Sequence, residues 1–130
     1  MTMKPEMMLL LWAVALTFVQ VLVSVQGAFM QVGLPMLAGN REGLSEMKGW
    51  AGRAHRAHRN MLENLVLFAA LVFVAVAAQK TNQMTLLGAQ LFFWGRVAYA
   101  LLYIGGIPWL RTAAWFVSVI GMILIFVQLV

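Results

Sequence analysis

The stretch RAHRAHRNMLENLVLFAALVFVAVAA, residues 53–78, passes from a basic run into a continuously apolar one. Every side chain from Leu65 to Ala78 is apolar. Because a helix needs roughly 20 mostly apolar residues to cross a bilayer, this stretch predicts a membrane span over about residues 56–78. Three further apolar runs predict spans over about residues 7–37, 84–104 and 109–130.

The composition of the whole chain agrees with four spans. Hydrophobic residues make up 63% of the 130 positions and charged residues only 10%, whereas soluble domains average about half apolar and a quarter charged. We therefore predict an all-α fold, an integral membrane four-helix bundle that forms one domain over residues 1–130. The net charge of +5 does not indicate nucleic acid in so apolar a chain, because basic residues orient membrane proteins and meet anionic lipids or ligands.

The segments between the spans are short and polar. A glycine-rich, charged segment from Ala38 to about Gly52 predicts the longest loop, and residues 79–83 predict a tight turn. Gly105, Gly106 and Pro108 end the third span. The first apolar run exceeds the membrane thickness, so we expect its second end to emerge into water. Small and polar residues share one stripe of this run, which predicts a face toward other helices: Gln20, Ser24, Gly27 and Gln31.

Basic residues near the span ends predict the orientation. Arg111 flanks the third loop, and five basic residues flank the first loop: Arg41, Lys48, Arg53, Arg56 and Arg59. The opposite face carries only Lys4 and Lys80. Loops one and three are therefore expected in the cytoplasm, with both termini on the opposite side.

The basic run opening the second span also brings different polar groups to one helical face. Arg56, Asn60 and Glu63 are separated by four and three residues, and Arg59 lies one turn before Glu63. A carboxylate inside a span needs a partner, and topology alone requires neither an amide nor an acid. We interpret this set as a ligand site, and Arg53 as an orienting charge. His55 and His58 lack the further ligands of a zinc site, so no metal is predicted.

The third and fourth spans add a second polar set. Arg96, Tyr99 and Tyr103 share one face of the third span, and Arg111 with Thr112 opens the fourth at the same membrane level. Arginine suits carboxylates, and a cation beside a hydroxyl lowers the pKa of a nearby thiol. Because the chain has no cysteine, such a thiol must come from a ligand. The residues alone predict an anionic, amphiphilic ligand.

The run Arg56-Ala57-His58-Arg59-Asn60-Met61-Leu62-Glu63 resembles the Arg-Ala-x-x-Asn-x-x-Glu signature of the MAPEG family, the membrane-associated proteins in eicosanoid and glutathione metabolism. Arg96, Tyr99, Tyr103 and Arg111-Thr112 follow in the order that this family has. The resemblance covers most of the chain. The short first loop of this chain and its tandem Arg-Ala-His repeat resemble a bacterial branch of the family. That resemblance implies that the protein lies in a bacterial inner membrane.

The resemblance implies a homotrimer that binds glutathione as co-substrate between subunits, and a transferase or peroxidase acting on a lipophilic small molecule. The implied glutathione-binding residues are Arg56, His58, Arg59, Asn60, Glu63, Arg96, Tyr99 and Tyr103, and the implied thiolate-stabilising residues are Arg111 and Thr112. The chain departs from the family at Gln31, where arginine is common, and at Val66, where proline is common.

Two alternatives to an enzyme stay open at this point. One is a non-catalytic member of the same fold that binds an anionic lipid or a membrane partner through the basic cleft. The other, weaker alternative is a small transporter, a class that typically has four spans in such a length. A transporter would be expected to have a carboxylate near the middle of the first span, whereas Glu6 lies at its outer edge.

Overall fold

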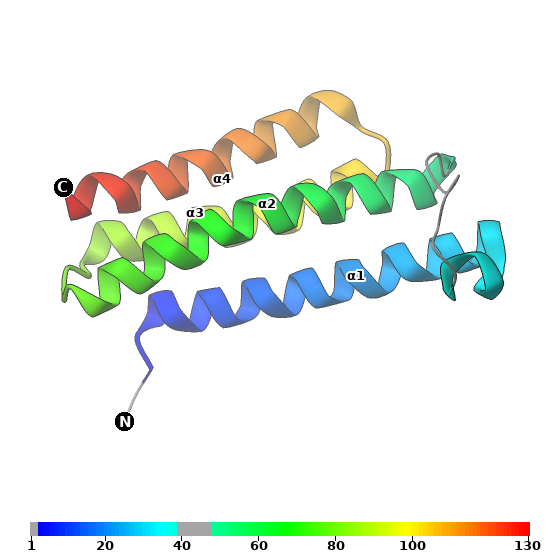
Figure 1. Ribbon diagram of the computed structural model, residues 1–130. Coiled ribbons are helices and arrows are strands. Elements are labelled where there is room, and N and C mark those ends of the chain that lie inside the picture. Colours follow the sequence, from blue (N-terminus) through cyan, green and yellow to red (C-terminus); the bar gives the residue numbers. More distant parts are fainter. Residues whose placement is uncertain (1–2, 39–47) are drawn as a thin grey trace.

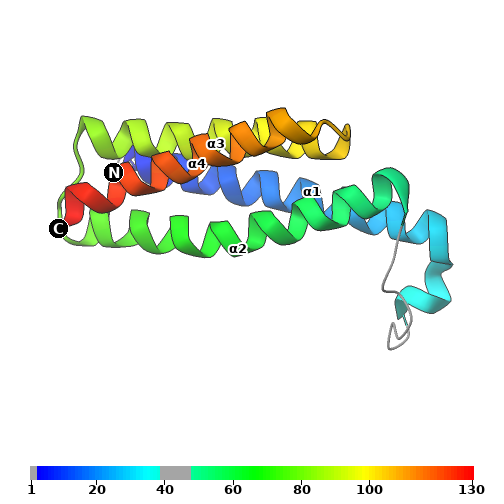
Figure 2. The same cartoon turned by 90° about the horizontal axis from the view of Figure 1, so that it is seen from above.

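The computed structural model describes residues 3–38 and 48–130, which form four long helices. These are α1 (Pro5–Ala38), α2 (Gly49–Ala77), α3 (Gln83–Ile104) and α4 (Pro108–Leu129). The helices lie side by side, and α1 begins at the end of the bundle where α4 ends (Figures 1 and 2). We call this the terminal end, and we call the opposite end, where α1 ends and α2 begins, the loop end.

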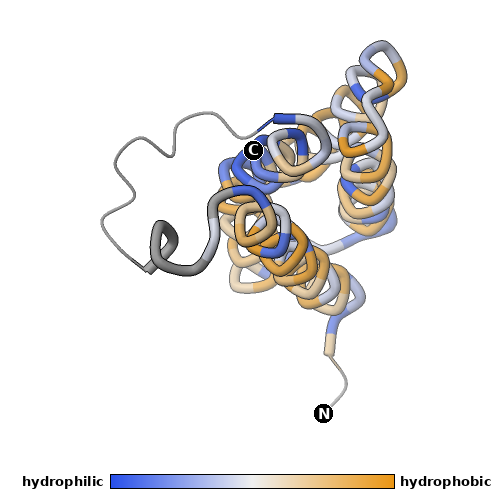
Figure 3. Tube along the Cα trace, turned by 90° about the vertical axis from the view of Figure 1, so that its right-hand side faces the viewer, coloured by the Kyte–Doolittle hydropathy of each residue, from blue (hydrophilic) through white to orange (hydrophobic). Residues whose placement is uncertain are grey.

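Each helix is long and apolar enough to cross a membrane. Large hydrophobic side chains are exposed on all four, for example Phe18 (64%) and Phe73 (67%), as expected where lipid or another subunit surrounds the bundle. Seen from the loop end, all the helices carry hydrophobic (orange) segments, with hydrophilic (blue) segments between them (Figure 3). The predicted all-α, integral multi-pass membrane fold is therefore confirmed.

The second helix begins earlier than the sequence composition indicates. Gly49–Gly52 was expected in the first loop, yet α2 starts at Gly49. The reason is close packing, since a Cβ built on Gly27 of α1 would lie 2.7 Å from the Cβ of Ala51. Small residues at this point let the two backbones approach, and helix packing outweighs the low helix propensity of glycine.

The first helix is interrupted near the loop end. Gly33 has a φ of 81°, which breaks the helical geometry inside α1. Just before it, the side chain of Gln31 bonds to both main-chain groups of Lys48, donating to the carbonyl at 2.6 Å and accepting from the amide at 3.1 Å. Gln20, Ser24 and Gly27 of the predicted stripe are buried, whereas Gln31 is exposed and anchors the start of α2.

The turns that connect the remaining helices follow the sequence signals. Asn82 caps α3, and its side chain accepts from the amides of Met84 and Thr85. The Thr85 hydroxyl in turn accepts a hydrogen bond from the main-chain amide of Asn82 at 2.8 Å, which completes a capping box. At the other end of α3, Gly106 has a φ of 78° and Pro108 starts α4.

Two contacts between helices stand out in the interior: one stacked aromatic pair and one very close approach of two helix backbones. Phe68 of α2 and Phe92 of α3 stack with ring centroids 4.0 Å apart. Gly88 of α3 and Gly121 of α4 face each other so closely that a Cβ on either residue would collide with the main-chain carbonyl oxygen of the other. Because lipid is as apolar as leucine, such close backbone packing is what holds helices together in a membrane.

A buried carboxyl group joins α1 to α3 at the terminal end. Glu6 is 3% exposed and its Oε2 accepts from the Thr85 hydroxyl at 2.6 Å. Nearby, the Asn82 side chain donates to Gln128 at 2.9 Å, which links the start of α3 to the end of α4. The acid at the edge of α1 therefore has a structural partner in α3.

Candidate functional site

Tyr103 joins three helices at the loop end. The Nε of Arg56 in α2 donates to the Tyr103 hydroxyl at 3.2 Å. The guanidinium of Arg111 in α4 lies over the same ring, with its Cζ 4.2 Å from the ring centroid. Both arginines were predicted to belong to the site, and the structure brings them together around one tyrosine on α3.

A second arginine and tyrosine continue this arrangement toward the membrane interior. The rings of Tyr99 and Tyr103 lie 5.4 Å apart, and the Arg96 guanidinium lies 4.3 Å from the Tyr99 ring centroid. We call the five residues Arg56, Arg96, Tyr99, Tyr103 and Arg111 the arginine–tyrosine cluster. Each cation in it meets the face of an aromatic ring, a favourable contact for guanidinium groups.

Arg96 carries unused hydrogen-bonding capacity in this cluster. It is 1% exposed, and its Nε, Nη1 and Nη2 find no acceptor in the described part of the chain. Burying a guanidinium without acceptors costs several kcal/mol, of the order measured for unpaired buried charges (~3–5 kcal/mol). The contact with Tyr99 offsets only part of that cost, so the site favours a group that accepts hydrogen bonds.

Small residues make the close approach of the helices possible. Ala57 of α2 and Ala114 of α4 are buried against Tyr99, and the aromatic side chains of Tyr103 and Trp115 cover them. A Cβ on Gly95 would lie 3.0 Å from the Ser118 amide of α4. The cluster is therefore held between rigid helices, which keeps its charged groups in fixed positions.

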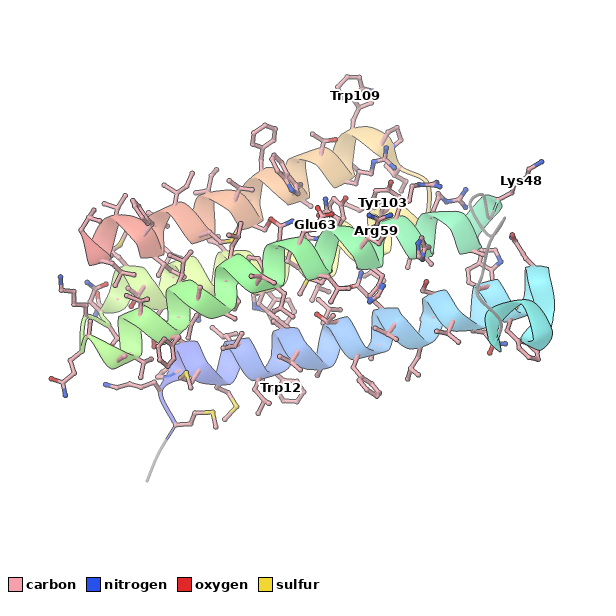
Figure 4. All side chains as sticks on the ribbon, in the orientation of Figure 1. Trp12, Lys48, Arg59, Glu63, Tyr103 and Trp109 are labelled. Atoms are coloured by element: carbon pink, nitrogen blue, oxygen red, sulfur yellow. The ribbon has the colours of Figure 1, made fainter. Side chains whose placement is uncertain are left out.

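The remaining predicted residues of α2 lie outside the arginine–tyrosine cluster. Glu63 and Arg59 are exposed, and in the view of Figure 4 they lie toward the same part of the bundle as Tyr103. In residues 3–38 and 48–130, Glu63 has no ion-pair partner, although an arginine was the expected one. Asn60 is half-buried, and its main-chain and side-chain oxygens accept from the side-chain amide of Asn64 at 2.9 and 3.1 Å.

Two of the predicted residues stand apart from the cluster. Thr112 is exposed, and its hydroxyl donates to the Pro108 carbonyl of its own helix at 3.1 Å. That hydroxyl proton is already used, so Arg111 is the better placed donor on α4. His58 is half-buried and its Nε2 has no partner among the described residues, as is true of the buried Oε1 of Gln20.

His55 lies outside the cluster as well. Its Nδ1 is 3.4 Å from the Ser24 hydroxyl, which joins α2 to α1. Within the described ranges, no third His, Cys, Asp or Glu gathers with His55 and His58.

Two residues at the loop end, Arg53 and Asn64, make contacts that the sequence did not predict. Arg53 was interpreted as an orienting charge, but its Nε donates to the Ile104 carbonyl at 2.9 Å and so caps the end of α3. Its position two turns before Asn60 carries no signal for that partner, which lies 51 residues away. Asn64 was overlooked too, although its spacing of four from Asn60 places the two amides on one helical face.

The charges of the site define what it can do chemically. Four guanidinium groups, those of Arg56, Arg59, Arg96 and Arg111, accompany the single carboxylate of Glu63, an excess of three positive charges. Arginines bind carboxylates with paired hydrogen bonds, and they stabilise a nearby thiolate. The single acid suits one ammonium group. The arrangement therefore fits a ligand with several anionic groups and one cationic group.

One of three comparisons with known proteins finds a match. Searches of the curated proteins and of the solved structures each find no match. A family model, that of the MAPEG family, matches residues 7–130. That range includes α2, α3 and α4, all of α1 except its first two residues, and every residue of the arginine–tyrosine cluster. The protein therefore belongs to the MAPEG family.

Proposed function

We propose that the protein is a membrane-embedded enzyme that binds glutathione and uses it on hydrophobic electrophiles, as a transferase or a peroxidase. The observation that carries this proposal is the arginine–tyrosine cluster, with a buried guanidinium whose donors are unused. Membership of a family named for glutathione metabolism supports the choice of ligand. The basic residues at the loop end support a cytoplasmic location for the site.

The charged groups of glutathione are opposite in sign to those of the site. Its two carboxylates suit Arg56 and the neighbouring cations, and its ammonium group suits Glu63. Arg111 then provides a positive charge for the thiolate, the reactive form of the peptide. Asn60 and His58 offer neutral hydrogen-bonding groups beside these charges. In this assignment the arginines, the amide, the histidine and the carboxylate of the predicted set each have a partner on the ligand.

We propose further that the protein is a homotrimer in which a neighbouring subunit covers the site. Arg56, Arg59 and Glu63 are exposed although they lie in a membrane-spanning helix. Of these, Glu63 lies furthest inside the predicted span, and a charge that faces lipid inside a span costs on the order of 3 kcal/mol. A second copy and the bound peptide would remove that cost by covering the same surface.

Calorimetric titration tests the proposed ligand directly. Detergent-purified protein is expected to bind glutathione, and Arg56→Ala is expected to weaken binding at least tenfold, because it removes one charge-assisted contact worth about 1.5–3 kcal/mol. The matched control is Arg53→Ala, a nearby arginine whose Nε bonds to the main chain of α3. Absence of binding by the folded wild-type protein would refute the proposal.

Asn64 provides a second prediction for the same ligand. Its amide donates to the Oδ1 of Asn60, which leaves the Asn60 amide nitrogen free to donate to the peptide. Asn64→Leu keeps the size but removes the donor, and we expect glutathione to bind about tenfold more weakly, since a misplaced hydrogen bond costs ~1.4 kcal/mol. Val66→Leu, on the exposed side of α2, is the control and should bind normally. Unchanged binding by Asn64→Leu would contradict this role.

A second candidate function is binding of an anionic lipid or membrane partner without catalysis. The engagement of the Thr112 hydroxyl with Pro108 favours it, because one of the two predicted thiolate donors is occupied. The same titration with anionic lipid in place of glutathione separates the two functions. Preference for lipid, with no response to the peptide, would favour the second one.

A further inference from the structure

Polar side chains line the contact between α1 and α2. Gln20 and Ser24 of α1 are buried, and the Ser24 hydroxyl lies 3.4 Å from Nδ1 of His55 in α2. His58 follows His55 by three residues, so it lies on the same side of α2 one turn further along. We call four residues the α1–α2 polar seam: Gln20, Ser24, His55 and His58.

The register of the two helices brings two residues of the seam to one level. α1 and α2 run antiparallel and side by side (Figure 1), and Ser24 meets His55 between them. The close approach of Gly27 to the start of α2 has the same register, one turn nearer the loop end. One turn in the other direction places Gln20 of α1 opposite His58 of α2.

Both of these residues have a covered polar atom without a partner. Gln20 is 4% exposed, and its Oε1 accepts no hydrogen bond from the described residues. Nε2 of His58 is also covered, and it too has no partner in that part of the chain. An unpaired buried polar atom is costly. Lipid and a neighbouring subunit cannot reach atoms that this subunit covers, whereas buried waters commonly bond to several such atoms at once.

We propose that the α1–α2 polar seam binds one ordered water molecule, which donates one hydrogen bond to Oε1 of Gln20 and another to Nε2 of His58. Both atoms can accept a hydrogen bond, and a water has two protons to donate. Because Nε2 accepts, the ring proton of neutral His58 is carried by Nδ1. Gln20 is thereby a positioning residue, since it holds the water that fixes the His58 ring.

This water site lies outside the arginine–tyrosine cluster and does not depend on glutathione. It gives the His58 ring a defined hydrogen-bonding direction, with the Nδ1 proton left to donate elsewhere. A donor suits an anionic ligand, whereas an acceptor does not. The water therefore adapts His58 to the kind of ligand that the charges of the cluster favour.

Nitrogen NMR of the histidine rings tests the inference without any ligand. The chain has only two histidines, His55 and His58, so ¹⁵N-histidine labelling of the full-length protein in lipid bilayers gives two sets of ring signals, which His55→Gln assigns. The spectra are recorded at about pH 9, where histidine is neutral. We expect His58 to carry its proton on Nδ1, and its Nε2 to show a contact with the protons of immobile water.

Gln20→Met is the test variant, because methionine has a similar length and removes the acceptor. We expect the His58 ring to shift largely to the Nε2-protonated form, which free neutral histidine prefers, and to lose its contact with water. Ser24→Ala is the matched control from the same stripe of α1. It should change the ring signals of His55 and leave those of His58 as they are.

An Nε2-protonated His58 in the wild-type protein would overturn the inference, even if Gln20→Met failed to fold. The same holds for an Nδ1-protonated ring without the water contact, since another group would then occupy Nε2. An unchanged His58 ring in Gln20→Met, or an equal change in Ser24→Ala, would overturn the role of Gln20. None of these outcomes affects the proposed function, which the glutathione titration tests separately.

Discussion

Arg111→Leu is expected to lower the turnover of glutathione by about 10²–10³-fold while leaving glutathione bound. In the proposed function Arg111 provides the positive charge for the thiolate, and loss of one preorganised donor typically lowers kcat by that factor. Its guanidinium is held 4.2 Å from the Tyr103 ring centroid, so its position does not depend on the ligand. Steady-state conjugation rates and calorimetric titration, made on the same preparation, give the two quantities.

Arg111→Lys and Thr112→Val are the matched variants. Lysine keeps the charge and should restore part of the turnover, although it lacks the planar fork of arginine. Thr112→Val should leave the rate within a few-fold, because the Thr112 hydroxyl donates to the Pro108 carbonyl. If Arg111→Leu turned over glutathione normally, or lost binding and turnover to the same extent, the role assigned to Arg111 would be wrong.

Gly121→Val is expected to have the largest effect on the fold. A Cβ at this position would collide with the Gly88 carbonyl oxygen and would lie 2.8 Å from the Phe92 amide nitrogen. These are main-chain atoms of α3, so the two helices must move apart. Overpacking of this kind costs ~1–3 kcal/mol or more. We expect a lower thermal midpoint and a smaller yield of monodisperse protein in detergent.

Ala113→Val is the control for this change, because it adds carbon atoms to an exposed position on the same helix. It should retain the wild-type midpoint. A Gly121→Val protein with an unchanged midpoint would show that α3 and α4 do not depend on their close contact. Size-exclusion chromatography on both variants measures the yield of monodisperse protein.

The sequence predicted the architecture well because its signals are local. Continuous apolar runs mark each span, and Gly105, Gly106 and Pro108 mark the last turn. The start of α2 was the exception. Gly49–Gly52 has a loop-like composition, but packing of Ala51 against Gly27 extends the helix there. That contact joins residues far apart in the chain, so composition alone could not predict it.

The candidate site was predictable where helical spacing decides it. Spacing alone placed Tyr99 and Tyr103 on one face of α3, and their rings lie 5.4 Å apart. It could not predict which helices would meet, as the bond from Arg53 to the Ile104 carbonyl illustrates. Nor could it reveal that the Thr112 hydroxyl is occupied within α4. Contacts between residues of one helix follow from the helical repeat of about 3.6 residues per turn. Contacts between residues of different helices depend on how the helices pack.

In the proposed function the arginine–tyrosine cluster binds glutathione as its thiolate. The most direct measurement is the ultraviolet thiolate absorbance of glutathione mixed with excess protein, followed as a function of pH. We expect the thiol to ionise at a lower pH with the wild-type protein than in buffer, and Arg111→Leu to lose this difference while still binding the peptide. An ionisation profile identical to that of free glutathione, under conditions where calorimetry shows the peptide bound, would show that the cluster does not stabilise the thiolate.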